Sequence, residues 1–424
     1  MEPSPELIDG IRKLGNYNQI YTNNTPLVTV AGVPLLMHEA ALAGLLAQLN
    51  MVFIGRSGPG KSQLISDIKN GIFNGDAVHL RGSADLKVRP VYCSIDLELY
   101  RQGRVDEAVK PRAAAGKMLH IMEEFNRAPP VIQNEWLAVG DRVLDIDGTQ
   151  IPLGNGYSVA IGAANIGNGE FSGTFQSDNA LKERLVLALD FDGKHRPQEL
   201  DYFSIFENSC DPRVVEAEKA DNRNLLVKLS GEVKAFARSI DYFVRMVQVY
   251  LATGLDEVEL GKKVHSKEEL PALGSAVEKD SEANKDMLNY VTAPSVRAVK
   301  VFGALVPSLA AVAISKGAPS DVAVGDACYA ALELILPFSD SLPKKVLSNN
   351  GGSRRLAALE VVGLIRRDIP SAELLGEGIR KASAGILEDR DIKVFNRPRV
   401  RCFGRLLMQI NENALREEAQ KARA

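Results

Sequence analysis

The sequence predicts an α/β domain with a parallel sheet flanked by helices, followed by a long region built mostly of helices. Short apolar runs alternate with helical periods between residues 31 and 197, a pattern typical of a layered α/β domain. After Pro197 the strand-like runs stop, and helical periodicity dominates as far as Ala424. A chain of 424 residues is also long enough to form about two to three domains without disulfides or metals.

The strand candidates are short apolar runs bounded by polar residues. They are Met51–Ile54, Met118–Met122, Val159–Ala163 and Leu185–Phe191. Two further runs, Val143–Ile146 and Thr149–Ile151, flank the dipeptide Asp147-Gly148, which favours a two-residue hairpin turn. Residues 1–30 are polar around an asparagine-rich stretch, and we expect a short helix and an irregular lead-in there.

Composition favours a soluble, cytoplasmic protein. The 51 basic residues nearly balance the 54 acidic ones, so a net charge of -3 creates no strong field for nucleic acid or an anionic membrane. The cysteines are too scattered for a zinc site or a disulfide framework, and free thiols suit a reducing cytosol; they are Cys93, Cys210, Cys328 and Cys402. The N-terminus has no secretory signal pattern. The apolar stretch Val301–Ser315 contains Pro307 and is shorter than the roughly 20 residues that span a bilayer, so we expect a buried helix.

A phosphate-binding loop follows the first predicted strand. The run Gly55-Arg56-Ser57-Gly58-Pro59-Gly60-Lys61-Ser62 matches GxxxxGK[ST] and leads into a helix with a regular apolar face. In such a loop backbone N–H groups surround phosphate oxygens, Lys61 reaches the β- and γ-phosphates, and the Ser62 hydroxyl ligates Mg²⁺. We therefore expect residues 55–63, with Gln63 as the last, to bind ATP and Mg²⁺.

Two acidic residues, Glu123 and Glu124, follow the apolar run Met118–Met122. At the carboxyl end of a strand beside a phosphate loop, one carboxylate can hold the Mg²⁺ shell and the other can polarise the attacking water. The sequence therefore indicates a nucleotide site that hydrolyses what it binds.

The run Glu123-Glu124-Phe125-Asn126-Arg127-Ala128-Pro129-Pro130 resembles the Walker B segment of MoxR-type AAA+ ATPases, usually written DE-x-NRAPP. The stretch from His38 to Ser62 is also similar to that family. The resemblance covers about residues 25–340 and implies an α/β P-loop NTPase core of AAA+ type. It implies a lead-in at 1–30, the nucleotide-binding domain at 31–197, a helical linker and lid at 198–340, and a helical region without an assigned role at 341–424.

The same resemblance implies roles for three more residues. Asn165 resembles sensor 1, which orients the lytic water, and Arg184 resembles the arginine finger that acts on a neighbouring subunit. Arg297 resembles the sensor 2 arginine at the start of a lid helix. Glu123 and Ser62 would bind the metal, and Glu124 and Lys61 would act in catalysis.

Several positions depart from the family pattern. Glu123 stands where the family has Asp, and its longer side chain implies a looser Mg²⁺ shell and slower turnover. Ile166 replaces the usual proline after sensor 1, while Glu183 and Leu185 replace Asp and Phe around the arginine finger. These changes indicate a divergent member of the family.

Two insertions resemble those of the branch that includes MoxR, magnesium chelatase and the MCM helicases. The insert Ser83–Gly116 resembles its helix insert, and Val143–Tyr157 resembles its presensor hairpin. The hairpin tip has two Asp and no Lys or Arg, which argues against nucleic acid in a central pore. The segment Lys393–Arg405 interleaves Phe395 and Phe403 with three arginines, Arg397, Arg399 and Arg401. Such segments can stack on single strands, although a partner or subunit contact is more common.

The leading hypothesis is therefore a Mg²⁺-dependent ATPase that forms a homo-oligomeric ring, expected to be a hexamer, and remodels a protein client. By resemblance the client machinery can include a separate von Willebrand factor A domain protein, because this chain has no DxSxS motif. Two alternatives stay open: a nucleic-acid motor or restriction or mobile-element ATPase, and a nucleotide-gated scaffold with little turnover.

Overall fold

The computed structural model describes residues 2–56, 58–165, 187–192, 195–208, 213–240, 242–260, 263–266, 291–339, 341–395 and 399–421. The chain forms two compact units. The α/β unit comprises Glu2–Ala237 and Pro307–Ala323, and the helical unit comprises Arg238–Val306 and Val324–Ala424. These units are defined by packing, and the four domain ranges expected from the sequence stay a prediction.

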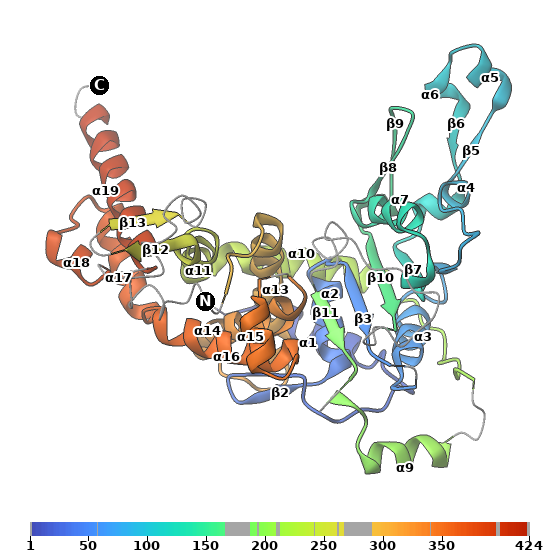
Figure 1. Cartoon of the computed structure of the whole chain (residues 1–424), viewed down its shortest axis with the longest axis horizontal. Coiled ribbons are helices and arrows are strands. Elements are labelled where there is room, and N and C mark those ends of the chain that lie inside the picture. The colour runs from blue at the N-terminus through green and yellow to red at the C-terminus, as the bar shows by residue number, and fades with distance from the viewer. Residues whose placement is uncertain are drawn as a thin grey trace. The chain divides into compact units, whose positions relative to one another are not determined.

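A five-stranded parallel sheet forms the centre of the α/β unit (Figure 1). Its order is β11 (Leu187–Asp190), β3 (Met51–Ile54), β10 (Val159–Ala164), β7 (Leu119–Glu123) and β4 (Val78–Arg81). All four predicted strands are present, and β4 is an additional edge strand. Because the strands are parallel and in register, Ile54 lies opposite Ala164 and Asp190, and Arg81 lies opposite Glu123. The predicted α/β P-loop core is confirmed.

Helices cover the sheet because its central strands are apolar on both faces; β3 and β10 are buried at every residue. The helices of this unit are α1 (Pro5–Gly15), α2 (Met37–Leu46), α3 (Lys61–Gly71), α7 (Pro130–Gly140), α9 (Glu199–Asn208) and α10 (Arg223–Ser239). A hairpin of β1 (Val28–Val30) and β2 (Val33–Leu35) joins α1 to α2. Trp136 is buried and stacks on Phe125.

The two predicted insertions meet at their tips. The first contains α4 (Arg89–Tyr92), β5 (Cys93–Ile95), α5 (Leu97–Arg101), α6 (Val105–Ala108) and β6 (Val109–Pro111). The second is the predicted hairpin, β8 (Val143–Ile146) and β9 (Thr149–Pro152), with Asp147 and Gly148 at positive φ. Tyr100 donates a hydrogen bond to Asp147, and Thr149 donates one to Asp106, both at 2.8 Å.

The helical unit contains α11 (Phe243–Ala252), α15 (Lys344–Asn349), α16 (Arg354–Asp368), α17 (Ala372–Ser383), α18 (Asp389–Lys393) and α19 (Arg401–Lys421). Two helices, α13 (Val296–Ser315) and α14 (Ser320–Ile335), are divided between the units. A short hairpin of β12 (Glu257–Leu260) and β13 (Lys263–Ser266) corrects the expectation that strands end at Pro197. Each strand is only four residues long and mixes polar with apolar residues, so it lacks the continuous apolar run by which the predicted strands of the sheet are recognised. Helix α13 is long and apolar enough to cross a membrane, but 72% of its most apolar stretch is buried, as in a core helix.

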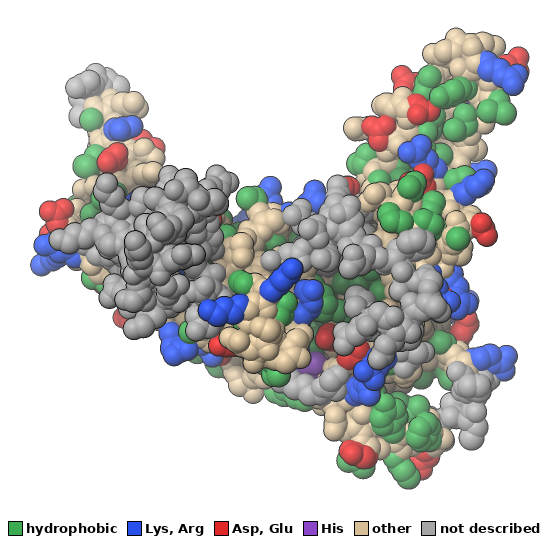
Figure 2. All heavy atoms as spheres, viewed as in Figure 1, with side chains coloured by type: hydrophobic (Ala, Val, Ile, Leu, Met, Phe, Trp, Pro, Cys, Tyr) green, Lys and Arg blue, Asp and Glu red, His purple; other side chains and the backbone are tan. Residues whose placement is uncertain are grey.

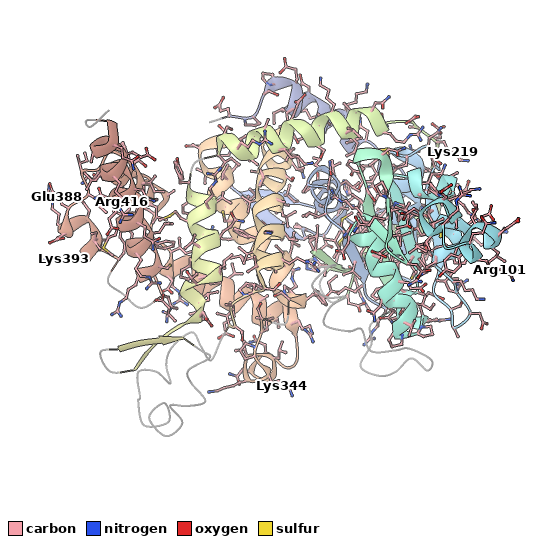
Figure 3. The ribbon with its side chains drawn as sticks, turned by 90° about the horizontal axis from the view of Figure 1, so that it is seen from above. Arg101, Lys219, Lys344, Glu388, Lys393 and Arg416 are labelled. Atoms are coloured by element: carbon pink, nitrogen blue, oxygen red, sulfur yellow. The ribbon has the colours of Figure 1, made fainter. Side chains whose placement is uncertain are left out.

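The aromatic and basic segment Lys393–Arg405 packs within the helical unit. Phe395 and Phe403 are buried, and Phe403 stacks on Tyr250 of α11. Arg399 forms a two-point ion pair with Asp368 at 2.6 and 3.2 Å. Lys393 is exposed at the surface (Figure 3), and Arg397 lies outside the described residues. These aromatic rings are therefore core residues and are not available to stack on bases.

Candidate functional site

The phosphate loop runs from the end of β3 to the start of α3, as the motif predicts. Gly58 and Gly60 have φ of 102° and 96°, a region that favours glycine. A Cβ at Gly60 would lie 2.7 Å from the Tyr21 ring, so no larger residue fits beside the lead-in segment. The loop therefore has the tight backbone that the phosphate-binding role requires. Ser57 lies outside the described residues.

Lys61 is buried at the base of this loop, only 8% exposed. Its Nζ donates hydrogen bonds to the carbonyl oxygens of Gly55 at 2.6 Å and Arg56 at 2.5 Å. Burial lowers the pKa of Lys61 to about 8, although the charges of Asp192, Asp190 and Glu123 act in the opposite direction. The Lys61 ammonium therefore loses its proton more readily than an exposed lysine does, and an anionic phosphate beside it would raise the pKa again.

Glu123 lies at the end of β7, next to the phosphate loop. Its pKa is lowered, first by a hydrogen bond from His79 and also by one from Ser62, while burial acts in the other direction. The ionised carboxylate and the Ser62 hydroxyl are hard oxygen ligands of the kind that Mg²⁺ prefers. The two residues therefore fit the metal-binding role predicted for them.

Glu124 faces a partner that sequence reasoning did not identify. The guanidinium of Arg81, at the end of β4, donates to both carboxylate oxygens of Glu124 at 3.0 and 3.2 Å. Arg127 lies 3.4 Å from the same carboxylate. Glu124 has a left-handed backbone, with φ of 51°. A Cβ at Gly82 would lie 2.2 Å from the carbonyl oxygen of Glu124, so only glycine fits after Arg81.

Asn165 directly follows β10 and lines the same pocket as Lys61 and Glu124. Asn126 donates a 2.9 Å hydrogen bond to its carbonyl oxygen, which ties the segment after β7 to the end of β10. The structure thus brings the predicted sensor 1 residue to the site. Arg184 lies outside the described residues, and Arg297 lies at the start of α13 in the helical unit. The finger and sensor 2 roles stay predictions.

The end of β11 also holds the phosphate loop. The backbone N–H of Arg56 donates to both carboxylate oxygens of Asp192, at 2.9 and 3.1 Å. Asp192 is in turn fixed by its own N–H, which donates to Asp190 at 2.9 Å. Sequence reasoning missed both residues, because they lie more than 120 positions beyond the loop and match no part of its motif.

The phosphate loop from Gly58 onward, the acidic pair and Asn165 line one pocket of about 1030 Å³ in the α/β unit. One end is polar and contains residues 58–63, Arg81, the Glu123–Glu124 pair and Asn165. The other end is lined by residues 19–22, by Ile205 and Phe206, and by residues 213–215. A pocket with phosphate-binding groups at one end and mainly apolar walls at the other suits a nucleotide.

Helix α9 leaves an apolar face exposed beside this pocket. Leu200, Phe203 and Phe206 are 81%, 64% and 68% exposed, and Figure 2 shows apolar side chains gathered over α9. Asp201 on the opposite side is buried, and it accepts hydrogen bonds from Asn24 and from the Gln198 N–H. The helix is therefore fixed on one side and presents its apolar residues on the other, with Phe206 shared between that face and the pocket.

No family model matches the sequence, and a search among curated proteins finds no match. Among solved structures, the chain is similar to one from Cytophaga hutchinsonii that is named a "putative ATPase". The two share 14% identity with a TM-score of 0.58, over 86% of this chain and 95% of the other. At this identity the likeness shows the fold alone, and that fold is the α/β core with a helical region that the sequence predicts.

Proposed function

We propose that the chain is a Mg²⁺-dependent ATPase of AAA+ type and a divergent member of the MoxR branch. One observation carries the proposal: Lys61, Ser62, Glu123, Glu124 and Asn165, from three separate motifs, all line one pocket. The similarity to a protein named a "putative ATPase" supports the same reading at the level of the fold.

Each residue has a distinct part in the proposed reaction. The N–H groups of Gly58 and of residues 60–62, together with the Lys61 ammonium, hold the triphosphate. Bound Mg²⁺ would neutralise charge on the phosphates, with Ser62 and Glu123 as its protein ligands. Glu124 orients and polarises the attacking water, together with Asn165. Arg81 donates to both oxygens of Glu124 and so weakens this carboxylate as an acceptor for the attacking water, and opening of the pair would favour hydrolysis.

We further propose that the protein works as a homo-oligomeric ring, a hexamer by family resemblance, in the cytoplasm. The exposed apolar face of α9 beside the pocket supports a neighbouring copy at that position. The neighbour's Arg184 would then complete the site, so that hydrolysis depends on assembly. The cycle would remodel a protein client, with a separate von Willebrand factor A domain protein as the candidate partner.

Measurements of ATP binding and of phosphate release from ATP in three variants test this function. Lys61→Ala should lose ATP binding, while Glu124→Gln should keep ATP binding and lose turnover. Arg184→Ala should also bind ATP without turnover, and mixing it with Glu124→Gln should restore part of the activity at hybrid interfaces. A Lys61→Ala protein that hydrolyses ATP at the wild-type rate would refute the assignment, and a mixture without recovery would refute the trans arginine.

The Glu124→Gln variant can also be used to identify the client. Glu124→Gln loaded with ATP should trap a protein partner in stoichiometric amount. Recovery of nucleic acid instead, sensitive to nuclease, would favour the motor alternative.

A further inference from the structure

The segment that joins α9 to α10 lies along α3, the helix that follows the phosphate loop. We call residues 213–222 the strap. Its backbone is hydrogen-bonded to α3 and to the residue after it: the Ala220 N–H donates to Asn70 and the Asn222 N–H donates to Ile72, both at 2.9 Å. The first three strap residues line the apolar end of the nucleotide pocket. The strap is therefore both a wall of the pocket and the connection to α10.

Two glutamine side chains hold the part of the strap nearest the pocket. Gln63 accepts from the Val215 N–H at 3.0 Å and donates to the Val215 carbonyl at 2.8 Å. Gln19 makes the same pair of bonds with Glu218, at 2.9 and 3.3 Å. In each case one side-chain amide pairs with both backbone groups of one strap residue, as a neighbouring strand would. Gln63 therefore directs its amide to the strap.

One buried carboxylate links this contact to the opposite wall. Asp67 accepts a 3.0 Å hydrogen bond from Gln63 with one oxygen. With its other oxygen it accepts the N–H groups of residues 19–21, at 3.1, 2.9 and 2.8 Å. Asp67 is completely buried, so these bonds are shielded from water. The lead-in segment and the strap are thereby fixed from one point on α3, on two sides of the same end of the pocket.

We propose that Gln63 is a positioning residue for nucleotide binding, because it holds strap residues 213–215 as the wall against the sugar and base. The inference rests on the proposed function, since it needs triphosphate at residues 58–62. The rest of a nucleotide would then extend toward the remaining lining residues, among them Ile20–Thr22 and Val214–Val215, and their mainly apolar side chains suit the flat faces of a base. Gln63 thus acts on the part of the ligand that the phosphate loop does not reach.

Calorimetric titration with ATP and with inorganic tripolyphosphate distinguishes two contributions to affinity. Tripolyphosphate reports on the residues that bind phosphate, and ATP reports also on those beside the sugar and base. Gln63→Leu keeps the size of the side chain and removes both strap bonds together with the bond to Asp67. Together two such bonds correspond to about a tenfold change in an equilibrium constant. We expect Gln63→Leu to bind ATP about tenfold more weakly than wild type and tripolyphosphate equally well. Equal ATP affinity, or an equal loss for both ligands, would overturn the role of Gln63.

Controls distinguish this result from failure of the proposed function. Gln102→Leu, at the exposed end of α5, should bind both ligands as wild type does. Lys61→Ala should lose both ligands. A wild-type protein that binds no ATP would remove the proposed function and this inference with it, whereas wild-type affinity in Gln63→Leu would remove the inference alone.

The rate of cleavage by trypsin measures how firmly the strap is held, and this assay needs no nucleotide. Lys219 is an exposed strap residue at the surface of the α/β unit (Figure 3), and Arg213 is exposed as well. Gln63→Leu should be cut faster at these two sites than wild type, with Gln102→Leu unchanged. Cleavage at the wild-type rate would show that Gln63 does not hold the strap.

Discussion

The lowered pKa of Lys61 makes a quantitative prediction about ATP binding. With a pKa of about 8, roughly half of the Lys61 side chains are uncharged at pH 8 when no ligand is bound. A triphosphate beside Nζ favours the charged form and raises this pKa. Binding at pH 8 should therefore take up about half a proton per site. The terminal phosphate, with a second pKa near 6, is already ionised there.

The affinity should follow the same titration. Between pH 7 and pH 9 the charged fraction of Lys61 in the free protein falls from nearly all to about a tenth, so ATP binding should weaken about tenfold. Below pH 7 this contribution to the pH dependence disappears. Isothermal titration in buffers of different ionisation enthalpy measures both the proton uptake and the affinity.

Lys61→Arg is the matched control, because a guanidinium stays charged over this range. Any ATP binding that Lys61→Arg retains should show neither proton uptake at pH 8 nor a fall in affinity between pH 7 and pH 9. A wild-type protein with constant affinity from pH 7 to pH 9 and no proton uptake at pH 8 would refute the reasoning. Lys61 would then keep its proton despite being buried beneath the loop.

Three other substitutions test further contacts of the α/β unit. Arg81→Ala should raise the rate of hydrolysis up to about fivefold at saturating ATP, because Glu124 loses its bidentate partner; a rate at or below wild type would contradict a restraining role. Gly82→Ala should lower the free energy of unfolding by about 1–3 kcal/mol in urea denaturation, because its Cβ would lie 2.2 Å from backbone. An unchanged midpoint would count against that tight contact. Phe203→Ser should reduce the mass measured by light scattering if α9 contacts a second copy, while Val227→Ser, also exposed, should leave it unchanged.

Local patterns were enough to predict the parts of the site that are contiguous in sequence. The phosphate loop and the Glu123–Glu124 pair each combine a motif with a preceding apolar strand, and parallel strands end at the same edge of a sheet. Strand β4 escaped prediction because it is a four-residue edge strand with only one fully buried residue. Without it, nothing in the sequence places Arg81 beside Glu124, 43 positions later.

Other contacts depend on tertiary packing that no local pattern encodes. Asp192 reaches the phosphate loop only because β11 pairs with β3, and that strand order is a property of the whole sheet. The segment Lys393–Arg405 is a second example: its alternating aromatic and basic residues are compatible with stacking on a single strand and, more commonly, with a partner or subunit contact. In the structure Phe403 packs on Tyr250 and Arg399 pairs with Asp368, so the same residues serve the core of the helical unit.

The contacts of Lys61 and Glu124 together indicate how binding and hydrolysis are coupled. Both charged groups already have hydrogen-bond partners within the protein. Lys61 donates to two carbonyl oxygens of the loop, and Glu124 accepts from Arg81. A triphosphate competes for both cations, since a phosphate is a stronger partner for Lys61 than a carbonyl and is a second anion for Arg81. In the proposed ATPase, Arg81 would turn toward the phosphates and so release Glu124 when a water needs to be oriented. Asp192 and Asp67 bond to backbone N–H groups of the loop and of the lead-in segment, and these bonds do not compete with phosphate. The walls can therefore stay in place while the two charged contacts are exchanged.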